Sequence, residues 1–328
     1  MTGRHGLIIF LLLLQPSPVG VGGAGAAGAD EQRIVRLVVS TKGEAEPVPP
    51  LRPEDVRVTE GGVERRIVSL AGEADAPLHV VLLIDVSGSQ EHLIEVSKSA
   101  SADFVKTALR PGRDQAAVVS FASKAVVEAP LTPDLGRAIG ALARIKFEPP
   151  SGYFGGVVIL SRKQPLPAGN LTISTSFWDA AAFVSREVFP SAPPDATRVV
   201  VLLSDGHDTS SQTKKKEAIE SLVRANVVVY SVGVGDVENY AGLDKDALRK
   251  VAEESGGLAV FPKRANDLSA AFAKVRATLR SHYLVTYSSP VEASAKSARK
   301  LKVEIVNPEL RRRGLRVSHP PRPATAAR

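Results

Sequence analysis

Cysteine is absent from this chain of 328 residues, which also has one methionine, one tryptophan and only 5% aromatic residues. Without cysteine the chain can form neither a disulfide nor a thiolate metal site, so a hydrophobic core must hold the fold unaided. A chain of this length can bury such a core. Any metal site would then rely on oxygen ligands, which favour Mg²⁺, Mn²⁺ or Ca²⁺ over zinc.

The chain after Asp30 also lacks hydrophobic runs long enough to span a membrane, so we predict no span in the mature protein. The apolar run Gly6 to Leu14 follows Arg4 and precedes a small-residue stretch that ends at Ala29. This order is typical of a secretory signal peptide. We therefore predict that residues 1–29 are removed near Asp30 and that the protein is exported, to the periplasm or outside the cell.

Positive charge is in excess, with a formal net charge of +7 that is concentrated between Lys296 and Arg316. Such a cluster is compatible with nucleic-acid binding. For an exported chain without interleaved aromatic residues, however, a solvated basic surface explains the cluster better. We therefore expect no nucleic-acid partner.

Between residues 78 and 281, apolar runs of strand length alternate with amphipathic helices of ten or more residues. This alternation predicts the α/β class: a doubly wound, mostly parallel sheet with helices on both faces. The ligand site of such a sheet lies beyond the carboxyl ends of its strands. The predicted strands are 78–84, 116–121, 125–129, 199–203, 227–234 and 258–261, and the predicted helices are 93–109, 135–145, 177–189, 214–226, 245–255 and 268–280.

Short strands flank this domain on both sides, in residues 30–77 and 282–318. In the first flank, Gly61-Gly62 between apolar runs at 56–58 and 67–70 predicts a hairpin. Because neither set of strands can bury a core alone, we expect the two flanks to pack into one small β-rich subdomain. Residues 319–328, rich in proline and alanine, are predicted to be a disordered tail.

Oxygen-bearing side chains follow two of the predicted strands. Asp85, Ser87 and Ser89 follow the first strand of the α/β domain, and Asp205 follows the strand at 199–203. Carboxyl ends of strands in one sheet can converge, so these groups can form one hard-cation site. Thr175 precedes the helix that contains Asp179 and is either an ordinary N-cap or a further ligand.

These motifs, in this order, resemble the von Willebrand factor type A (vWA) domain and its metal-ion-dependent adhesion site (MIDAS). The flanks, with sequences such as LRPEDVRVTEGGVERRIVSL and SHYLVTYSS, resemble most closely the exported bacterial "VWFA-related" branch, described from acidobacteria. The resemblance covers roughly residues 33 to 318. It implies a Rossmann-like fold, no enzymatic activity, a bound Mg²⁺, Mn²⁺ or Ca²⁺, and adhesion or protein binding through an Asp or Glu of a partner.

The resemblance also implies roles for single residues. Ser87 and Ser89 would coordinate the ion directly, Thr175 directly or through water, and Asp85 and Asp205 mainly through bound waters. The chain departs from the family pattern at Ile173-Ser174, where Gly-Gly is common, and at Gln90, where methionine is frequent. Thr172 or Ser174 therefore stays an alternative to Thr175.

An insertion at residues 146–170, with a possible strand at 157–160, leads into the Thr175 loop. We expect it near the ligand face, where it either shapes partner choice or is a neutral loop. Phe177 and Trp178 at the start of the next helix are interpreted as core residues.

Two other functions stay open. A hydrolase would use Ser87 with His79, His92 or His207 as base, but no G-x-S-x-G motif is present. A structural scaffold would keep the metal site in a vestigial or purely stabilising role.

Overall fold

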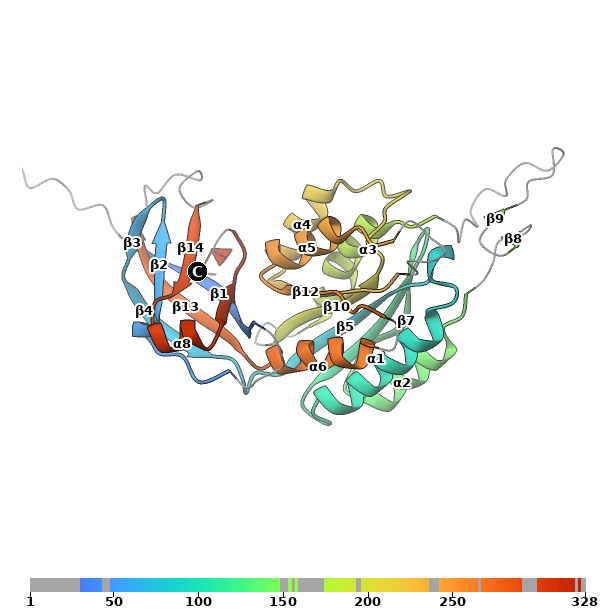
Figure 1. Cartoon of the computed structure of the whole chain (residues 1–328), viewed down its shortest axis with the longest axis horizontal. Helices are drawn as coiled ribbons and strands as arrows, with labels where there is room; N and C mark the ends of the chain where they lie inside the picture. Colours follow the sequence, from blue (N-terminus) through green and yellow to red (C-terminus); the bar gives the residue numbers. More distant parts are fainter. Residues whose placement is uncertain are drawn as a thin grey trace, which may run out of the picture.

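The computed structural model describes residues 30–42, 48–147, 153–154, 157–158, 174–192, 196–235, 242–264, 267–290, 300–321 and 324–325. The predicted signal peptide and most of the insertion at 146–170 lie outside these residues. An α/β unit and a smaller β unit lie side by side (Figure 1).

The α/β unit is built on a six-stranded sheet whose strand order is β12-β11-β10-β5-β6-β7. Five strands are parallel, and only the edge strand β7 runs antiparallel to its neighbour. The strands are β5 (Leu78–Asp85), β6 (Gln115–Phe121), β7 (Ala125–Thr132), β10 (Thr197–Ser204), β11 (Val227–Gly233) and β12 (Leu258–Val260).

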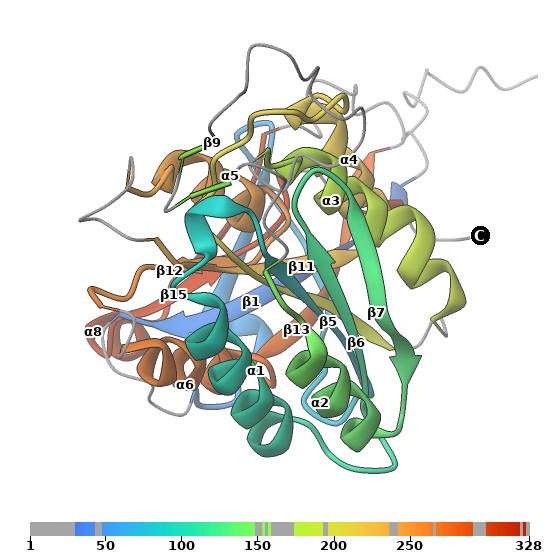
Figure 2. The same ribbon diagram turned by 90° about the vertical axis from the view of Figure 1, so that its right-hand side faces the viewer.

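Helices cover both faces of this sheet (Figures 1 and 2). Val80, Leu82 and Ile84 of β5 pack in the core on one face, while Val81 and Leu83 pack in the core on the other. Because both faces are covered, every residue of β5 is buried. One face carries α1 (Ile94–Ala108), α2 (Leu135–Arg144) and α6 (Leu268–Thr278), and the other carries α3 (Phe177–Phe183), α4 (Lys215–Arg224) and α5 (Lys245–Glu254). This confirms the predicted doubly wound fold.

The flanks form two antiparallel sheets, which confirms the β-rich part of the predicted fold class. One has the order β15-β1-β13-β4, with β16 also paired to β1, and the other has the order β14-β2-β3. Leu37 and Tyr287 are fully buried in the core of this β unit. Its elements are β1 (Asp30–Thr41), η1 (Pro53–Asp55), β2 (Val56–Glu60), β3 (Val63–Arg65), β4 (Ile67–Gly72), β13 (His282–Pro290), β14 (Leu301–Ile305), α8 (Pro308–Arg312), β15 (Leu315–Ser318) and β16 (Ala324–Thr325).

The hairpin at Gly61-Gly62 is present, but its second strand is not the predicted one. Gly61 and Gly62 both have positive φ and join β2 to β3, a short polar strand that apolar patterning did not reveal. The apolar run at 67–70 becomes β4 and pairs with β13 in the other sheet.

The predicted disordered tail also differs where the structure describes it. His319 and Pro320 are half-buried, and Ala324 and Thr325 pair with β1. The His319 ring accepts a hydrogen bond from the Val303 N–H over 3.2 Å. Tertiary contacts thus order residues whose composition predicts disorder.

Elsewhere, the single helix predicted at 177–189 has three parts: α3, a π-helical segment (Val184–Val188) and a 3₁₀ turn (Phe189–Ser191) that extends two residues further. In the insertion, β8 (Tyr153–Phe154) pairs with β9 (Val157–Val158), where the predicted strand begins. Among the described residues, no helix is both long and apolar enough to cross a membrane.

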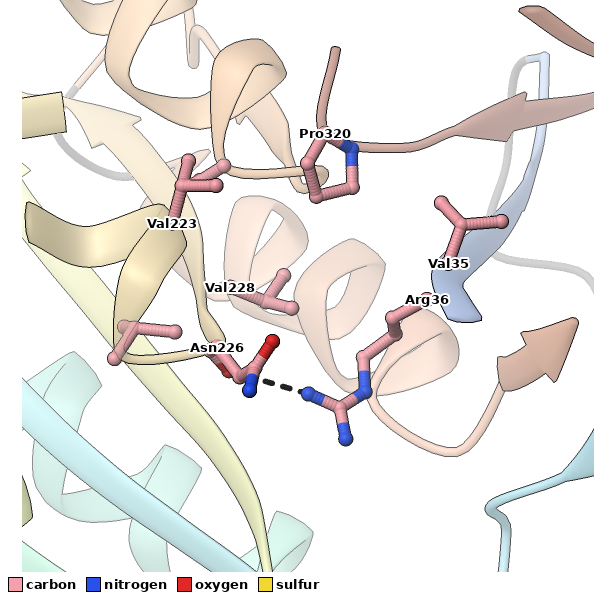
Figure 3. Close-up of a pocket in the computed structure, with 8 residues that line it drawn as sticks. Val35, Arg36, Val223, Asn226, Val228 and Pro320 are labelled. Carbon is pink, nitrogen blue, oxygen red and sulfur yellow. Dashed lines mark hydrogen bonds between the residues drawn. The ribbon is translucent and has the colours of Figure 1, made fainter. Parts of the chain in front are cut away.

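Arg36 joins the β unit to the α/β unit. Its guanidinium donates to both carboxylate oxygens of Glu73, at 2.7 and 2.9 Å. It also donates to the Asn226 carbonyl at 3.1 Å (Figure 3). Beside it, a cavity of about 20 Å³ lies between β1, the α4–β11 turn and Pro320. Val38 of β1 also reaches into the core of the α/β unit, so the two units share packing.

Candidate functional site

The carboxyl ends of β5 and β10 lie next to each other, because these strands are parallel neighbours. β5 ends with Asp85, and β10 ends with Ser204, which Asp205 follows directly. The Ser204 hydroxyl donates to Asp85 Oδ2 over 2.6 Å and so joins the two strand ends. The sheet topology therefore brings together two carboxylates that are far apart in the sequence.

Asp85 is almost fully buried, with 3% of its surface exposed. Its Oδ1 accepts the Ser87 N–H over 2.9 Å. Burial, followed by the nearby negative charge of Asp205, raises the pKa of Asp85 to about 7 despite these hydrogen bonds. Two carboxylates in this position repel each other, and a bound cation would relieve that repulsion.

The two serines link the strand ends from the β5 side. The hydroxyls of Ser87 and Ser89 are 3.2 Å apart, and the Ser89 hydroxyl donates to Asp205 Oδ2 over 2.5 Å. Gln90 is buried and donates from Nε2 to the same Oδ2 over 3.1 Å. Four of the five predicted site residues therefore lie in one hydrogen-bonded cluster: Asp85, Ser87, Ser89 and Asp205, together with Ser204.

Thr175 reaches this edge through the loop that follows Asp205. Its N–H donates to the Thr209 hydroxyl over 2.8 Å, and its carbonyl accepts from the backbone N–H groups of Thr209 and Ser210 over 2.8 and 3.1 Å. These contacts fix the Thr175 main chain against the loop, but they do not join its side chain to the serines. Thr172 lies outside the described residues.

The N-cap alternative for Thr175 is wrong. Helix α3 begins at Phe177, its N-cap residue is Ser176, and the side chain of Asp208 accepts the Phe177 N–H over 2.9 Å. The cap therefore comes from the Asp205 loop, which sequence spacing could not reveal. Thr175 is 4% exposed and lies one position before the cap.

Sequence reasoning missed two residues of the cluster. Ser204 is the last residue of its strand and directly precedes Asp205, and this position could have marked it. Gln90 stood out only as a departure from the family pattern, and its role depends on the Val234 carbonyl, to which Nε2 also donates over 3.1 Å.

The donor set suits a hard divalent cation. Within the described residues, no group of three or more His, Cys, Asp or Glu side chains gathers, so hydroxyls must complete any metal site. Two carboxylates and neighbouring serine hydroxyls supply oxygen donors and a negative charge that balances a divalent ion. The residues present therefore fit Mg²⁺, Mn²⁺ or Ca²⁺.

His207 lies in the loop that begins at Asp205. A ring nitrogen of His207 lies 3.2 Å from the Gly242 carbonyl, while its backbone N–H donates to Asp205 Oδ1. Both contacts of this candidate base are therefore with groups other than Ser87 and Ser89.

Phe177 and Trp178 lie in the core. They are 1% and 6% exposed, with ring centroids 4.7 Å apart in an edge-to-face arrangement. Lys215 lies over the Trp178 ring at 5.2 Å. These rings therefore pack in the core, as expected, rather than presenting a ligand platform.

A doubly wound α/β unit with a cluster of carboxylates and hydroxyls at its carboxyl edge defines the class of protein. Two sequence profiles, both described as von Willebrand factor type A domain, match residues 80–207 and 169–274. The chain is a von Willebrand factor type A domain protein. No curated protein sequence matches it.

Solved structures with similar folds share little sequence with this chain. Proximal thread matrix protein 1 of the mussel byssus is 18% identical with a TM-score of 0.48, over 68% of this chain and 49% of that one. BatB of Bacteroides thetaiotaomicron is 18% identical with a TM-score of 0.44, over 60% of this chain and 97% of that one. A type A domain of Catenulispora acidiphila is 20% identical with a TM-score of 0.47, over 77% and 51%. This chain thus spans about half of the mussel protein, one structure of which has a zinc-occupied MIDAS motif.

Proposed function

We propose that this protein is an exported, non-enzymatic recognition module that binds a divalent cation, Mg²⁺ by preference, and through it a carboxylate of a partner protein. The proposed metal residues are Asp85, Ser87, Ser89, Thr175 and Asp205. The observation that carries the proposal is the contact between the Ser89 hydroxyl and Asp205 Oδ2, which links the two strand ends at 2.5 Å.

Each residue has a distinct part in this proposal. The hydroxyls of Ser87 and Ser89 bind the ion directly, whereas Asp85 and Asp205 balance its charge and hold bound waters. Thr175 contributes a further hydroxyl, directly or through water. Because hydroxyls are weak donors, the bound ion keeps its attraction for an acidic side chain from a partner.

Mg²⁺ titration of the mature protein tests the site. We expect the melting temperature of the wild type to rise with Mg²⁺ concentration, with a stabilisation of about 2.7 kcal/mol at a hundred times Kd. Ser87→Ala should abolish this dependence because it removes one direct donor. Calorimetric titration of both proteins measures the binding directly.

Thr107→Ala is a matched control, since it removes a hydroxyl of α1 that donates to the Asp103 and Phe104 carbonyls of the same helix. It should keep the full Mg²⁺ response. Equal Mg²⁺ binding by wild type and Ser87→Ala would refute the assignment. Calorimetric binding of Mg²⁺ without any binding of a partner protein would instead favour a stabilising scaffold.

A stabilising scaffold is the second candidate, and a specific observation favours it. The Ser204 hydroxyl joins β10 directly to Asp85, so the cluster also has a structural role. This candidate predicts that Mg²⁺ raises the melting temperature while Asp85→Ala leaves capture of partner proteins unchanged. The recognition proposal predicts that capture is lost on chelation and in Asp85→Ala.

Export is proposed from the sequence alone. If residues 1–29 are a signal peptide, the mass of the secreted or periplasmic protein should correspond to a chain that begins near Asp30. A protein that keeps these residues in the cytoplasm would contradict export and leave the metal proposal untouched.

A further inference from the structure

A pocket of about 30 Å³ lies beside the metal-binding edge, beyond the carboxyl end of β11. Its apolar lining includes Leu93, Val234, Leu243 and Leu268, and its rim carries Lys263 and Arg264. Gly235 packs closely against this lining, since an added Cβ would lie 2.6 Å from Leu243 Cδ2.

The two cations of the rim are available to a ligand. Lys263 and Arg264 are both exposed. Among the described residues, neither side chain has an acidic group within 4.0 Å, which is the limit for an ion pair. The nearest acid by contact is Asp267, whose carboxylate accepts the Arg264 backbone N–H over 3.2 Å and so leaves the guanidinium unengaged.

Gln90 connects this pocket to the metal-binding cluster. Its side chain donates to Asp205 Oδ2 on one side and to the carbonyl of Val234, a pocket-lining residue, on the other. The backbone carbonyl of Gln90 accepts the backbone N–H of Leu93, which also lines the pocket. One buried side chain therefore separates the proposed metal site from the Leu93 and Val234 wall of the pocket.

We propose that this basic pocket is a second contact site for the partner, and that the partner presents a peptide segment with at least two acidic residues. One carboxylate binds the metal, a second pairs with Lys263 and Arg264, and an apolar side chain between or beside them covers the pocket. This inference rests on the proposed function and specifies its partner.

Charge and shape favour this occupant over a nucleic acid. Two exposed cations beside an apolar hollow suit a short segment that carries both charge and an apolar side chain. A phosphate backbone would need a longer basic track, usually with aromatic side chains for single strands. Exposed ion pairs are individually weak, so the second carboxylate should improve affinity by about threefold to tenfold.

Synthetic peptides on a surface test the proposal with the full mature chain in Mg²⁺. One set carries a single aspartate in an alanine, glycine and leucine background, and the other adds a second aspartate at successive positions. The double variant Lys263→Ser/Arg264→Ser removes the rim charges but keeps the backbone N–H that Asp267 accepts. Lys300→Ser/Arg312→Ser removes the same charges from exposed positions on the β unit and is the control.

We expect one spacing of the two aspartates to bind the wild type and the control about threefold to tenfold more tightly than one aspartate. The gain should shrink as salt rises and disappear in Lys263→Ser/Arg264→Ser, which should still bind single-aspartate peptides in Mg²⁺. If no spacing gives a gain, or the gain survives in that variant, the second contact site is refuted while the proposed function stands. If no peptide binds in a Mg²⁺-dependent way, both are refuted.

Discussion

At the scale of single residues, Gln90 has a position that its family resemblance did not predict. Its amide holds Asp205 on one side and the Val234 carbonyl on the other, and it is 2% exposed. An amide can donate to both acceptors at once, which the methionine frequent in related sequences cannot do. Gln90 therefore fixes the orientation of a carboxylate in the proposed metal site.

Gln90→Met should lower the free energy of unfolding of the metal-free protein by about 1 to 3 kcal/mol. The reason is that Asp205 Oδ2 and the Val234 carbonyl, both buried, each lose the hydrogen bond from Gln90. Urea unfolding of the metal-free protein measures this loss. Gln90→Glu is the informative companion, since it adds negative charge beside Asp205. Without metal, Gln90→Glu should lose more stability than Gln90→Met, and saturating Mg²⁺ should restore part of that loss. Wild-type stability of Gln90→Met would show that the two hydrogen bonds contribute nothing.

His282 should give the protein a pH dependence that does not involve the proposed metal site. It is 1% exposed, and its Nε2 lies 2.6 Å from the Tyr230 hydroxyl. Burial, followed by the positive charges of Arg36 and Arg280, lowers the pKa of His282 to about 3 from its ordinary 6.5. The folded protein thus holds this imidazole neutral.

Because the unfolded chain binds a proton near pH 6.5 and the folded one does not, stability should fall as pH drops below 6.5. The loss of stability due to His282 is at most about 1.4 kcal/mol for each pH unit between about 6.5 and 3, and there is no such loss above pH 6.5. Urea unfolding at several pH values, compared between wild type and His282→Gln, isolates this term. Parallel pH profiles for the two proteins would contradict the lowered pKa.

At the scale of elements, the turn after β10 depends on a glycine. Gly206 has a φ of 85°, and a Cβ there would lie 2.6 Å from the Asp244 carbonyl and 2.8 Å from Leu248 Cγ. Its N–H donates to the Ser204 hydroxyl, which in turn donates to Asp85. The turn that presents Asp205 therefore requires both the left-handed conformation and the missing side chain.

Gly206→Ala should destabilise the protein by about 3 kcal/mol or more, from left-handed strain and overpacking together. Gly112→Ala is a matched control, because Gly112 has a φ of 74° but no atom within 4 Å of an added Cβ. It should lose only about 1 to 2 kcal/mol. Urea unfolding compares the two, and equal losses would show that the contact with α5 is easily relieved.

Secondary structure was predictable where burial decides it. The strands and helices of the α/β unit have the expected order, because apolar periodicity follows directly from packing on one or both faces. The polar strand β3 and the edge pairing of Ala324 and Thr325 were missed, since both depend on hydrogen bonds to distant partners. Likewise, the cap of α3 comes from Asp208 in another loop.

At the scale of the whole molecule, Arg36 and Glu73 join the two units. Their side chains are 17% and 10% exposed, so the pair is largely removed from water. Arg36 also reaches the Asn226 carbonyl of the α/β unit (Figure 3). This places one ion pair at the junction through which the chain both enters and leaves the α/β unit.

Arg36→Ala should cost about 3 to 5 kcal/mol, because it leaves the Glu73 carboxylate buried without its partner. Arg36→Ala/Glu73→Ala should cost less than the sum of the single changes, since neither charge is then uncompensated. Urea unfolding of all four proteins completes the cycle. Additive single losses would show that the pair is not coupled.

The sequence by itself determined the fold class and the residue types of the candidate site, and it is the sole basis for proposing export. Apolar periodicity follows from burial, and oxygen ligands at strand ends follow from the chemistry of hard cations. It also predicted that the two flanks belong together, because neither can bury a core alone.

Only the tertiary structure decided how the site is held. The register of β5 against β10 sets Ser204 on Asp85, and the end of β11 sets the Val234 carbonyl against Gln90. The basic pocket arises from the same arrangement, since Leu93, Val234 and Lys263 follow three different strands. Such contacts between distant residues carry no local pattern, because a hydrogen bond depends on the distance between two atoms and not on their separation along the chain.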